Sequence, residues 1–217
     1  MRHHSSEYTQ IVAAARRLAT LGFVAAGDGN VSIRGDSGLI ISPSGRALGE
    51  IAEDELVLVG PDGTVDRGRP SSELPMHSAI YRVRPDVKAI VHTHAPYATA
   101  FAVSGTNIDA GILPELDVTV GPVELVSYAT PGSETLAARL AEVAEGHDAF
   151  LLANHGLVTA GRSLEEAVAR HETVEHAAKI LYLAKALGGP KRLSAQDRED
   201  LRELRARTLG RRDVETR

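Results

Sequence analysis

The sequence contains no cysteine and no tryptophan, and aromatic residues make up only 4% of it. Without cysteine there is neither a disulfide framework nor thiolate chemistry, so any bound metal ion must be held by nitrogen and oxygen ligands. Because aromatic rings are scarce, the hydrophobic core must be built mainly from leucine, valine, isoleucine and alanine.

Long apolar runs and an excess of positive charge are missing too. The apolar stretches fall well short of the roughly 20 residues that a membrane-spanning helix needs, and the N-terminal residues MRHHSSEYTQ lack the apolar centre of a signal peptide. A formal net charge of -5 argues against a general nucleic-acid-binding protein, because a phosphate backbone selects a basic surface. We therefore expect a cytoplasmic protein that binds neither a membrane nor nucleic acid.

The 217 residues are enough for a single domain with a substantial core. We expect this domain to span the whole chain, with its core over residues 8–187 and a C-terminal helix over 194–209. Hydrophobic periodicity, glycine positions and capping residues predict the elements. The other predicted helices cover residues 8–21, 97–103, 134–145 and 163–187, with a further helix starting at Ser71 or Ser72; the predicted strands include 31–33, 38–41, 56–59, 118–120, 123–126 and the runs from 89 and 149.

The stretch AIVHTHA, residues 89–95, delivers two histidines at the end of an apolar run. In a strand, His92 and His94 point to the same face and Thr93 points to the other, so the two imidazoles can converge on one metal ion. An isolated pair of this kind is also typical of solvated side chains on a surface strand. A second apolar run, AFLLANHG, also ends in a histidine, His155, and this match favours a site made of three histidines.

Two polar segments indicate an anion site, although each has a simpler interpretation. Gly27, Gly29 and Asn30 precede a strand and form either a turn or a cradle of backbone N–H groups. Ser71 and Ser72 read as a helix start, and a helix N-terminus with two hydroxyls is also a site for an anion.

The remaining histidines are weaker candidates. His77 lies one helical turn beyond Glu73 and is either a packed side chain or a partner of the site. His171 and His176 are five residues apart on one predicted helix, so they lie on different faces and should not share a metal ion.

Taken together, these motifs resemble the class II aldolase and adducin head family, and most closely its bacterial L-fuculose-1-phosphate aldolase branch. The resemblance covers residues 11–187 and rests on GDGNVSIR, ISPSG, PSSELPMH, AIVHTHAPYATA and LLANHGLVTAG in this order. It implies a three-layer α/β/α fold with a central, mainly antiparallel sheet. It also implies a homotetramer with active sites at the subunit interfaces.

The same resemblance assigns roles to individual residues. It implies a Zn²⁺ ion, with Mn²⁺ or Co²⁺ as alternatives, bound by His92, His94 and His155. Glu73 becomes the acid/base carboxylate, and in resting enzymes of the family this glutamate also binds the metal. The residues implied in phosphate binding are Gly29, Asn30, Ser44, Gly45, Ser71 and Ser72.

One segment departs from the fuculose-phosphate pattern. Those enzymes use a loop tyrosine from a neighbouring subunit as proton donor, and a second tyrosine in the C-terminal tail. Here the loop reads GILPELD and the tail RTLGRRDVETR, and neither contains tyrosine. We hypothesise that Glu115 replaces the missing phenol, or that the aldehyde half of the substrate differs.

The expected activity is zinc-dependent cleavage of a ketose 1-phosphate, through an enediolate, to dihydroxyacetone phosphate and a short aldehyde. L-Fuculose 1-phosphate and related deoxyketose phosphates are the expected substrates. An epimerase, dehydratase or decarboxylase acting on a phosphorylated sugar or sugar acid is the alternative, although the epimerase branch has aspartate where Glu73 stands. A non-enzymatic adducin-like head is the third reading, and it conflicts with the presence of all three histidines.

Overall fold

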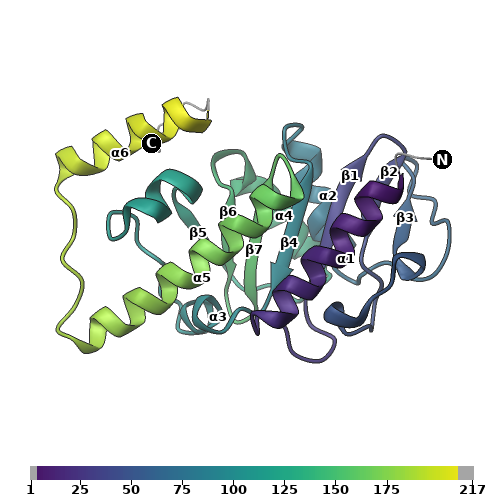
Figure 1. The fold of residues 1–217 in the computed structure, drawn as a ribbon, viewed down its shortest axis with the longest axis horizontal. Coiled ribbons are helices and arrows are strands. Elements are labelled where there is room, and N and C mark those ends of the chain that lie inside the picture. The colour runs from purple at the N-terminus through teal and green to yellow at the C-terminus, as the bar shows by residue number, and fades with distance from the viewer. Residues whose placement is uncertain (1–3, 210–217) are drawn as a thin grey trace.

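A computed structural model describes residues 4–209, and Figure 1 shows a central seven-stranded sheet with helices packed on it. The strand order is β3-β2-β1-β4-β7-β6-β5, and every neighbouring pair is antiparallel except β5 and β6. The mainly antiparallel sheet is thus confirmed. The strands are β1 (Asn30–Gly35), β2 (Gly38–Ile41), β3 (Val57–Val59), β4 (Ala89–Thr93), β5 (Val123–Val126), β6 (Ala149–Leu152) and β7 (Gly156–Gly161).

Helices cover both faces of this sheet, which confirms the three-layer architecture. On one face, α1 (His4–Thr20), α3 (Pro96–Val103) and α5 (Leu164–Ala186) pack over a large apolar cluster, and Figure 1 shows α1 and α5 in front of the strands. The other face carries α2 (Leu74–Val83) and α4 (Glu134–Val143) over a second cluster. A last helix, α6 (Ala195–Leu209), follows an extended segment after α5. The tail beyond residue 209 lies outside the described residues.

Alternation along β4 decides which layer each side chain enters. Val91 packs into the cluster under α1 and α5, whereas Ile90 packs into the cluster under α2 and α4. His92 is therefore directed to the α2 side. Its neighbours across the sheet are Asn30 on β1 and Val158 on β7, so the central strand places His92 between two buried partners.

The structure corrects the type of one predicted element and the start of another. Residues 118–120 are not a strand but part of a π-helix, Leu116–Val120, whose carbonyl groups accept hydrogen bonds from arginine side chains of α5 and α6. These arginines take up the acceptors that a sheet ladder would use, which overrides the β propensity of the sequence VTV. The helix expected at Ser71 or Ser72 begins later, because Glu73 occupies the N-cap position of α2.

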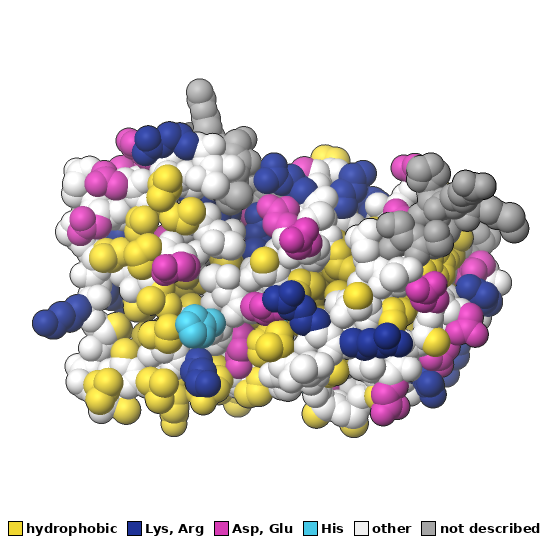
Figure 2. All heavy atoms as spheres, in the orientation of Figure 1, with side chains coloured by type: hydrophobic (Ala, Val, Ile, Leu, Met, Phe, Trp, Pro, Cys, Tyr) yellow, Lys and Arg dark blue, Asp and Glu magenta, His cyan; other side chains and the backbone are white. Residues whose placement is uncertain are grey.

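The longest described helix, α5, has 23 residues and buries several polar side chains against the sheet. Within residues 4–209, no helix has both the length and the apolar character that a membrane span requires. Figure 2 shows basic and acidic side chains interspersed over the visible face, without a continuous basic surface.

His171 on α5 is fully buried, and burial lowers its pKa to about 3. Its Nε2 lies 2.7 Å from Thr93 Oγ1, and its Nδ1 lies 3.0 Å from Thr159 Oγ1. The Thr159 hydroxyl donates its hydrogen to Ala167 O, so it accepts from Nδ1–H, and the imidazole is held neutral in one tautomer. His176 is exposed on the same helix, which confirms that the two histidines occupy different faces.

This burial predicts an acid-sensitive contribution to stability. An unfolded histidine gains a proton as the pH falls below about 6.5, whereas folded His171 resists protonation down to about 3. The stabilisation is therefore complete above pH 6.5 and is lost as the pH falls through this window. We expect His171→Gln to reduce the acid slope of the unfolding free energy by about 1.4 kcal/mol per pH unit. Urea unfolding at several pH values measures this slope. A slope that is unchanged in His171→Gln, or that changes equally in His176→Gln, contradicts the prediction.

Candidate active site

Three histidines meet at one end of the central strands. His92 is on β4, His94 follows that strand, and His155 lies in the turn between β6 and β7, which Asn154 forms with a positive φ of 57°. The centroid of the His92 ring lies 5.3 Å from that of the His94 ring and 4.7 Å from that of the His155 ring. One nitrogen of each ring can be chosen so that all three lie within 4.8 Å of one another. The predicted convergence of the three imidazoles is therefore present in the fold.

The turn packs so tightly that glycine is required after His155. A Cβ atom at Gly156 would lie 2.6 Å from Thr93 O and 2.8 Å from His94 Cδ2. Any side chain there would push the chain or the imidazoles apart.

Glu73 brings a carboxylate into the same place. It is 5% exposed at the N-cap of α2, with Oε2 2.9 Å from His92 Nε2 and Oε1 3.5 Å from His155 Nε2. Asn30 Nδ2 donates a hydrogen bond to Oε2 at 3.1 Å. Among the described residues, Glu73 Oε1, His92 Nε2 and His155 Nδ1 are buried atoms without a hydrogen-bond partner. Such orphaned polar atoms are costly, and a bound group that satisfies them offsets the cost.

The electrostatics of this cluster favour neutral imidazoles at His94 and His155 beside an ionised carboxylate. Burial lowers the pKa of His155 to about 4 and also lowers that of His94. Burial alone raises the pKa of Glu73, but His92, His155 and the Asn30 amide together hold it well below its usual range. Burial lowers the pKa of His92, and Glu73 outweighs this effect and raises it.

This donor set fits a divalent metal ion. Neutral imidazole nitrogens and a carboxylate oxygen are the ligands that zinc sites use when no thiolate is present, and Mn²⁺ or Co²⁺ also accepts them. A cation between His92 and Glu73 takes the place of a proton shared by the two groups. His92, His94 and His155 would hold the ion, with Glu73 as a fourth ligand in the resting state.

Asp28 lies beside His94 and was not among the site residues predicted from the sequence. Its Oδ2 lies 3.2 Å from His94 Nδ1, and both side chains are partly exposed. Metal-binding histidines usually donate their second N–H to such an acceptor, which fixes the tautomer. The only signal in the sequence is a carboxylate two residues before Asn30 in a glycine-rich turn.

Removing the charge of Asp28 should weaken metal binding. We expect Asp28→Asn to raise the dissociation constant for Zn²⁺ by about 10- to 100-fold, because the His94 ring loses its orienting acceptor. Competition with a chromogenic chelator measures this constant. Asp36→Asn, in the turn between β1 and β2, is the control, and equal affinity in Asp28→Asn and the unmodified protein contradicts the assigned role.

The residues expected to bind phosphate lie on three segments around Glu73. Gly29 has a φ of 79°, and a Cβ there would lie 2.9 Å from His92 O, so only glycine fits. Ser71 is buried, and its Oγ accepts a hydrogen bond from Glu73 N at 3.3 Å.

Two backbone hydrogen bonds hold the third segment, the Ser44–Gly45 turn, beside Ser71. Ser44 N donates to Arg69 O and Ser71 N to Ser42 O, which places the Ser44 turn beside the start of α2. Gly45 and Ser72 are exposed at the ends of this arrangement. Asn30 is buried, and its side chain is already bonded to Glu73 and His77.

Glu115 does not join the three histidines within one chain. It is exposed immediately before the π-helix, and Arg170 bonds both to Thr119 O of this π-helix and to Ala160 O. Ala160 pairs with Ile90 near the start of β4, away from His92. Among the described residues, no hydrogen bond or ion pair joins Glu115 to any of the three histidines.

His77 is fully buried, and burial lowers its pKa to about 3. Its Nε2 lies 2.6 Å from Asn30 Oδ1, and its Nδ1 lies 2.7 Å from Ser32 Oγ. Of the two roles that the sequence left open, the structure supports a partner of the site, because Asn30 connects His77 to Glu73.

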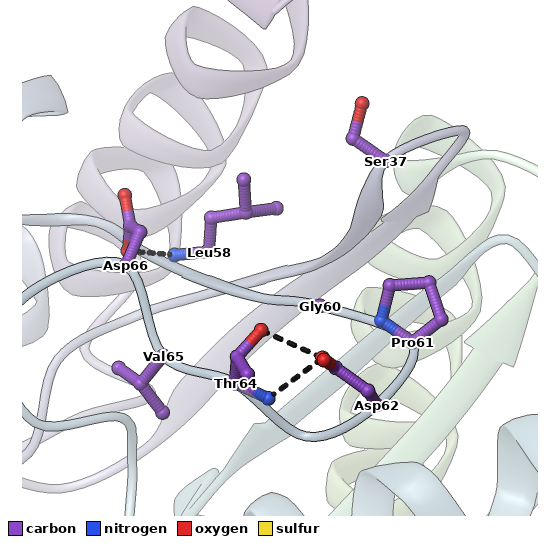
Figure 3. A pocket seen from close by; sticks show the side chains of 8 residues that line it. All are labelled: Ser37, Leu58, Gly60, Pro61, Asp62, Thr64, Val65 and Asp66. Atoms are coloured by element: carbon purple, nitrogen blue, oxygen red, sulfur yellow. Dashed lines mark hydrogen bonds between the residues drawn. The ribbon is translucent and has the colours of Figure 1, made fainter.

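A cavity of about 410 Å³ lies elsewhere, along β3 and the loop that follows it (Figure 3). Its carboxylates are used locally: Asp62 accepts hydrogen bonds from Thr64, and Asp66 accepts one from Leu58 N. None of the predicted site residues lines it, so the histidine cluster remains the candidate active site.

The fold and the cluster together define an α/β domain with a buried carboxylate facing three histidines that could hold a metal ion. Residues 9–182 match the family model described as class II aldolase and adducin N-terminal domain. The chain therefore belongs to the class II aldolase and adducin family, and it is an enzyme of the class II aldolase type.

Three curated relatives and one solved structure show how close this likeness is. The chain is 38% identical to a 5-deoxy-D-ribulose 1-phosphate aldolase of Bacillus thuringiensis, over 90% of this chain and 93% of the relative. It is 37% identical to an L-fuculose phosphate aldolase of Methanococcus maripaludis (74% and 88% covered) and to a 3-oxo-tetronate 4-phosphate decarboxylase of Escherichia coli (75% and 79%). A solved L-fuculose 1-phosphate aldolase superposes with a TM-score of 0.85 at 33% identity, covering 93% of this chain and 98% of that one.

Proposed function

We propose that this protein cleaves a ketose 1-phosphate, L-fuculose 1-phosphate or a related deoxyketose phosphate, to dihydroxyacetone phosphate and a short aldehyde. The observation that carries the proposal is the position of Glu73, 2.9 Å from His92 Nε2 and 3.5 Å from His155 Nε2. A carboxylate at this distance can move protons on a substrate held by the histidine cluster. The 5-deoxyribulose phosphate aldolase among the relatives supports a deoxyketose substrate.

The proposed reaction breaks the C3–C4 bond of the ketose. The C4 hydroxyl loses its proton as the aldehyde forms, and the electron pair of the broken bond passes to C3 and the C2 carbonyl as an enediolate. Glu73, ionised at neutral pH, then takes up a proton from solvent and delivers it to C3, which completes dihydroxyacetone phosphate. When bound, Zn²⁺ would supply positive charge that stabilises this anion.

Backbone and hydroxyl groups would hold the phosphate. Gly29 and Asn30, the Ser44–Gly45 turn, and Ser71 with Ser72 at the start of α2 offer N–H and O–H donors on three sides. Anchoring the phosphate fixes the reacting carbons beside Glu73, and such positioning is a large part of the rate acceleration in reactions of this kind.

Glu115 of a neighbouring subunit is proposed to accept the proton of the C4 hydroxyl as the aldehyde forms, in place of the missing tyrosine. We expect Glu115→Gln to reduce turnover by about 10²- to 10⁴-fold if it acts as this general base. Steady-state kinetics with the ketose phosphate that the enzyme cleaves measure the effect. Undiminished turnover in Glu115→Gln contradicts the assignment. Glu134→Gln, at the first turn of α4, is the control.

A decarboxylase is the second candidate, because the chain is 37% identical to a 3-oxo-tetronate 4-phosphate decarboxylase. The two reactions share an enediolate and differ in the leaving group, which is carbon dioxide instead of an aldehyde. An epimerase or dehydratase acting through the same anion has no matching relative among those compared above. A non-enzymatic head is disfavoured because all three histidines and Glu73 are present.

Product analysis tests the proposal. Phosphorylated ketoses and 3-oxo acid phosphates are incubated with the zinc-loaded protein, and dihydroxyacetone phosphate is detected with a coupled dehydrogenase. Release of dihydroxyacetone phosphate together with an aldehyde supports an aldolase. Release of dihydroxyacetone phosphate together with carbon dioxide, and without an aldehyde, replaces it with the decarboxylase.

We also propose that the protein is a homotetramer with its active sites at subunit interfaces. Apolar side chains near the end of α5 support an interface, since Leu187 is 88% and Tyr182 57% exposed. Val103 is exposed on α3, the helix whose Tyr97 ring lies 5.8 Å from that of Tyr182. Light scattering coupled to size-exclusion chromatography gives the mass in solution, and a monomer contradicts both this assembly and the role of Glu115.

A further inference from the structure

Behind the carboxylate of Glu73, helix α2 and strand β1 interlock through polar side chains. Glu73, His77 and Tyr81 recur every four residues and thus form one stripe facing the sheet. Asn30 and Ser32 alternate along β1 and face this stripe. Each of these five residues is at most 6% exposed. They form one buried hydrogen-bond chain, and the proposed reaction gives no role to three of its members, His77, Tyr81 and Ser32.

The chemistry of the first member fixes the direction of this chain. An ionised carboxylate only accepts hydrogen bonds, so the Asn30 group at 3.1 Å from Glu73 Oε2 must be its NH₂. The carbonyl oxygen of the same amide then faces His77 Nε2 at 2.6 Å. Since that oxygen only accepts, His77 Nε2 must carry the hydrogen.

The remaining links follow from this hydrogen. With Nε2 protonated, Nδ1 of a neutral His77 is an acceptor, and the Ser32 hydroxyl at 2.7 Å donates to it. The Ser32 hydrogen is then used, so the 2.8 Å contact with the Tyr81 hydroxyl runs from the tyrosine to Ser32 Oγ. Hydrogen bonds therefore point in one direction, from Tyr81 to Glu73.

We propose that His77 is a positioning residue, whose Nε2–H fixes the Asn30 amide with its NH₂ group toward the Glu73 carboxylate. Without this donor, rotation of the amide by half a turn would place two oxygen acceptors against each other. Glu73 would then lose its only side-chain donor among the described residues outside the histidine cluster and would leave its position. The structure assigns His77 a tautomer as well as a role, which makes the proposal directly measurable.

The tautomer is tested by ¹⁵N–¹H correlation spectra of the imidazole rings in the zinc-loaded, full-length protein. His77→Gln identifies the His77 signals by their loss. We expect the Nε2–H tautomer at pH 7, with Nδ1 unprotonated. The Nδ1–H tautomer, or a ring carrying both hydrogens, overturns the proposal. This measurement does not depend on the reaction that the enzyme catalyses.

Kinetics test the consequence for Glu73, and this part rests on the proposed function. We expect His77→Leu to lower kcat by about 10- to 100-fold with KM unchanged, the range typical of residues behind a metal site. His77→Gln keeps an N–H donor and should recover most of this loss. Equal kcat in the two variants, or native kcat in His77→Leu, overturns the proposal.

A histidine far from the site provides the control. His147→Leu removes a partly buried ring near the start of β6, at the end of the sheet away from His92, and should leave kcat unchanged. If His77→Leu does not fold, the tautomer measurement on the unmodified protein still decides. If no ketose phosphate is cleaved, the proposed function fails, while the tautomer result stands separately.

Discussion

Replacing Glu73 with glutamine should reduce cleavage of the ketose phosphate by about 10²- to 10⁴-fold, the contribution of a general acid–base group. Glutamine has the same shape but cannot take up a proton, and it removes the negative charge between His92 and His155. Turnover is followed by coupled detection of dihydroxyacetone phosphate, and metal content is measured on the same sample. Normal metal content with lost turnover assigns the loss to proton transfer.

A second buried glutamate supplies a matched control for this experiment. Glu175 on α5 is 6% exposed and accepts hydrogen bonds from the backbone of Tyr97 and Ala98. Glu175→Gln keeps an oxygen acceptor and lies outside the histidine cluster, so turnover should stay near that of the unmodified enzyme. Glu73→Gln with unreduced turnover contradicts the catalytic role.

Removing one imidazole of the cluster should abolish high-affinity metal binding. We expect His155→Ala to weaken Zn²⁺ binding by more than the 10- to 100-fold typical of residues behind a metal site, because it removes a ligand itself. The thermal stabilisation by Zn²⁺ should disappear with it, since a ligand present at 1,000 times its dissociation constant contributes about 4 kcal/mol to a protein. Calorimetric titration and thermal unfolding with and without Zn²⁺ measure the two effects.

His176→Ala separates this effect from the general loss of a histidine. His176 is exposed on α5 and does not belong to the three-histidine group, so the variant should bind Zn²⁺ as the unmodified protein does. Full zinc-dependent stabilisation in His155→Ala contradicts the proposed ligand set.

Part of the histidine cluster was predictable from sequence because strand alternation is a short-range rule. Alternation in a strand places His92 and His94 on one side, and Thr93 on the other side contacts His171, as the alternation requires. The matching run before His155 ends at the same edge because β6 and β7 form a hairpin beside β4. That pairing with β4 is a tertiary contact, and only the similarity of the two apolar runs indicated it.

Features that depend on tertiary contacts could not be read in this way. The sequence VTV favours a strand, yet Arg170 and Arg205 bind its carbonyl groups and stabilise a π-helix. Asp28 lies in a turn whose glycines pointed only to phosphate binding. The role of His77 required the register of α2 against β1, which no local pattern specifies.

The carboxylate of Asp148 connects three distant parts of the chain. Asp148 is 2% exposed and pairs with Arg84, Arg170 and Arg205, at 2.9, 3.1 and 3.2 Å. Asp86 also pairs with Arg84, and Glu166 also pairs with Arg170 and Arg162.

Arg205 on α6 is the last of these cations along the sequence. A nascent chain folds from its N-terminus as it is made, so Arg84 and Arg170 are available to Asp148 before Arg205 is. A chain interrupted before residue 205 lacks the guanidinium group that α6 brings to this buried carboxylate.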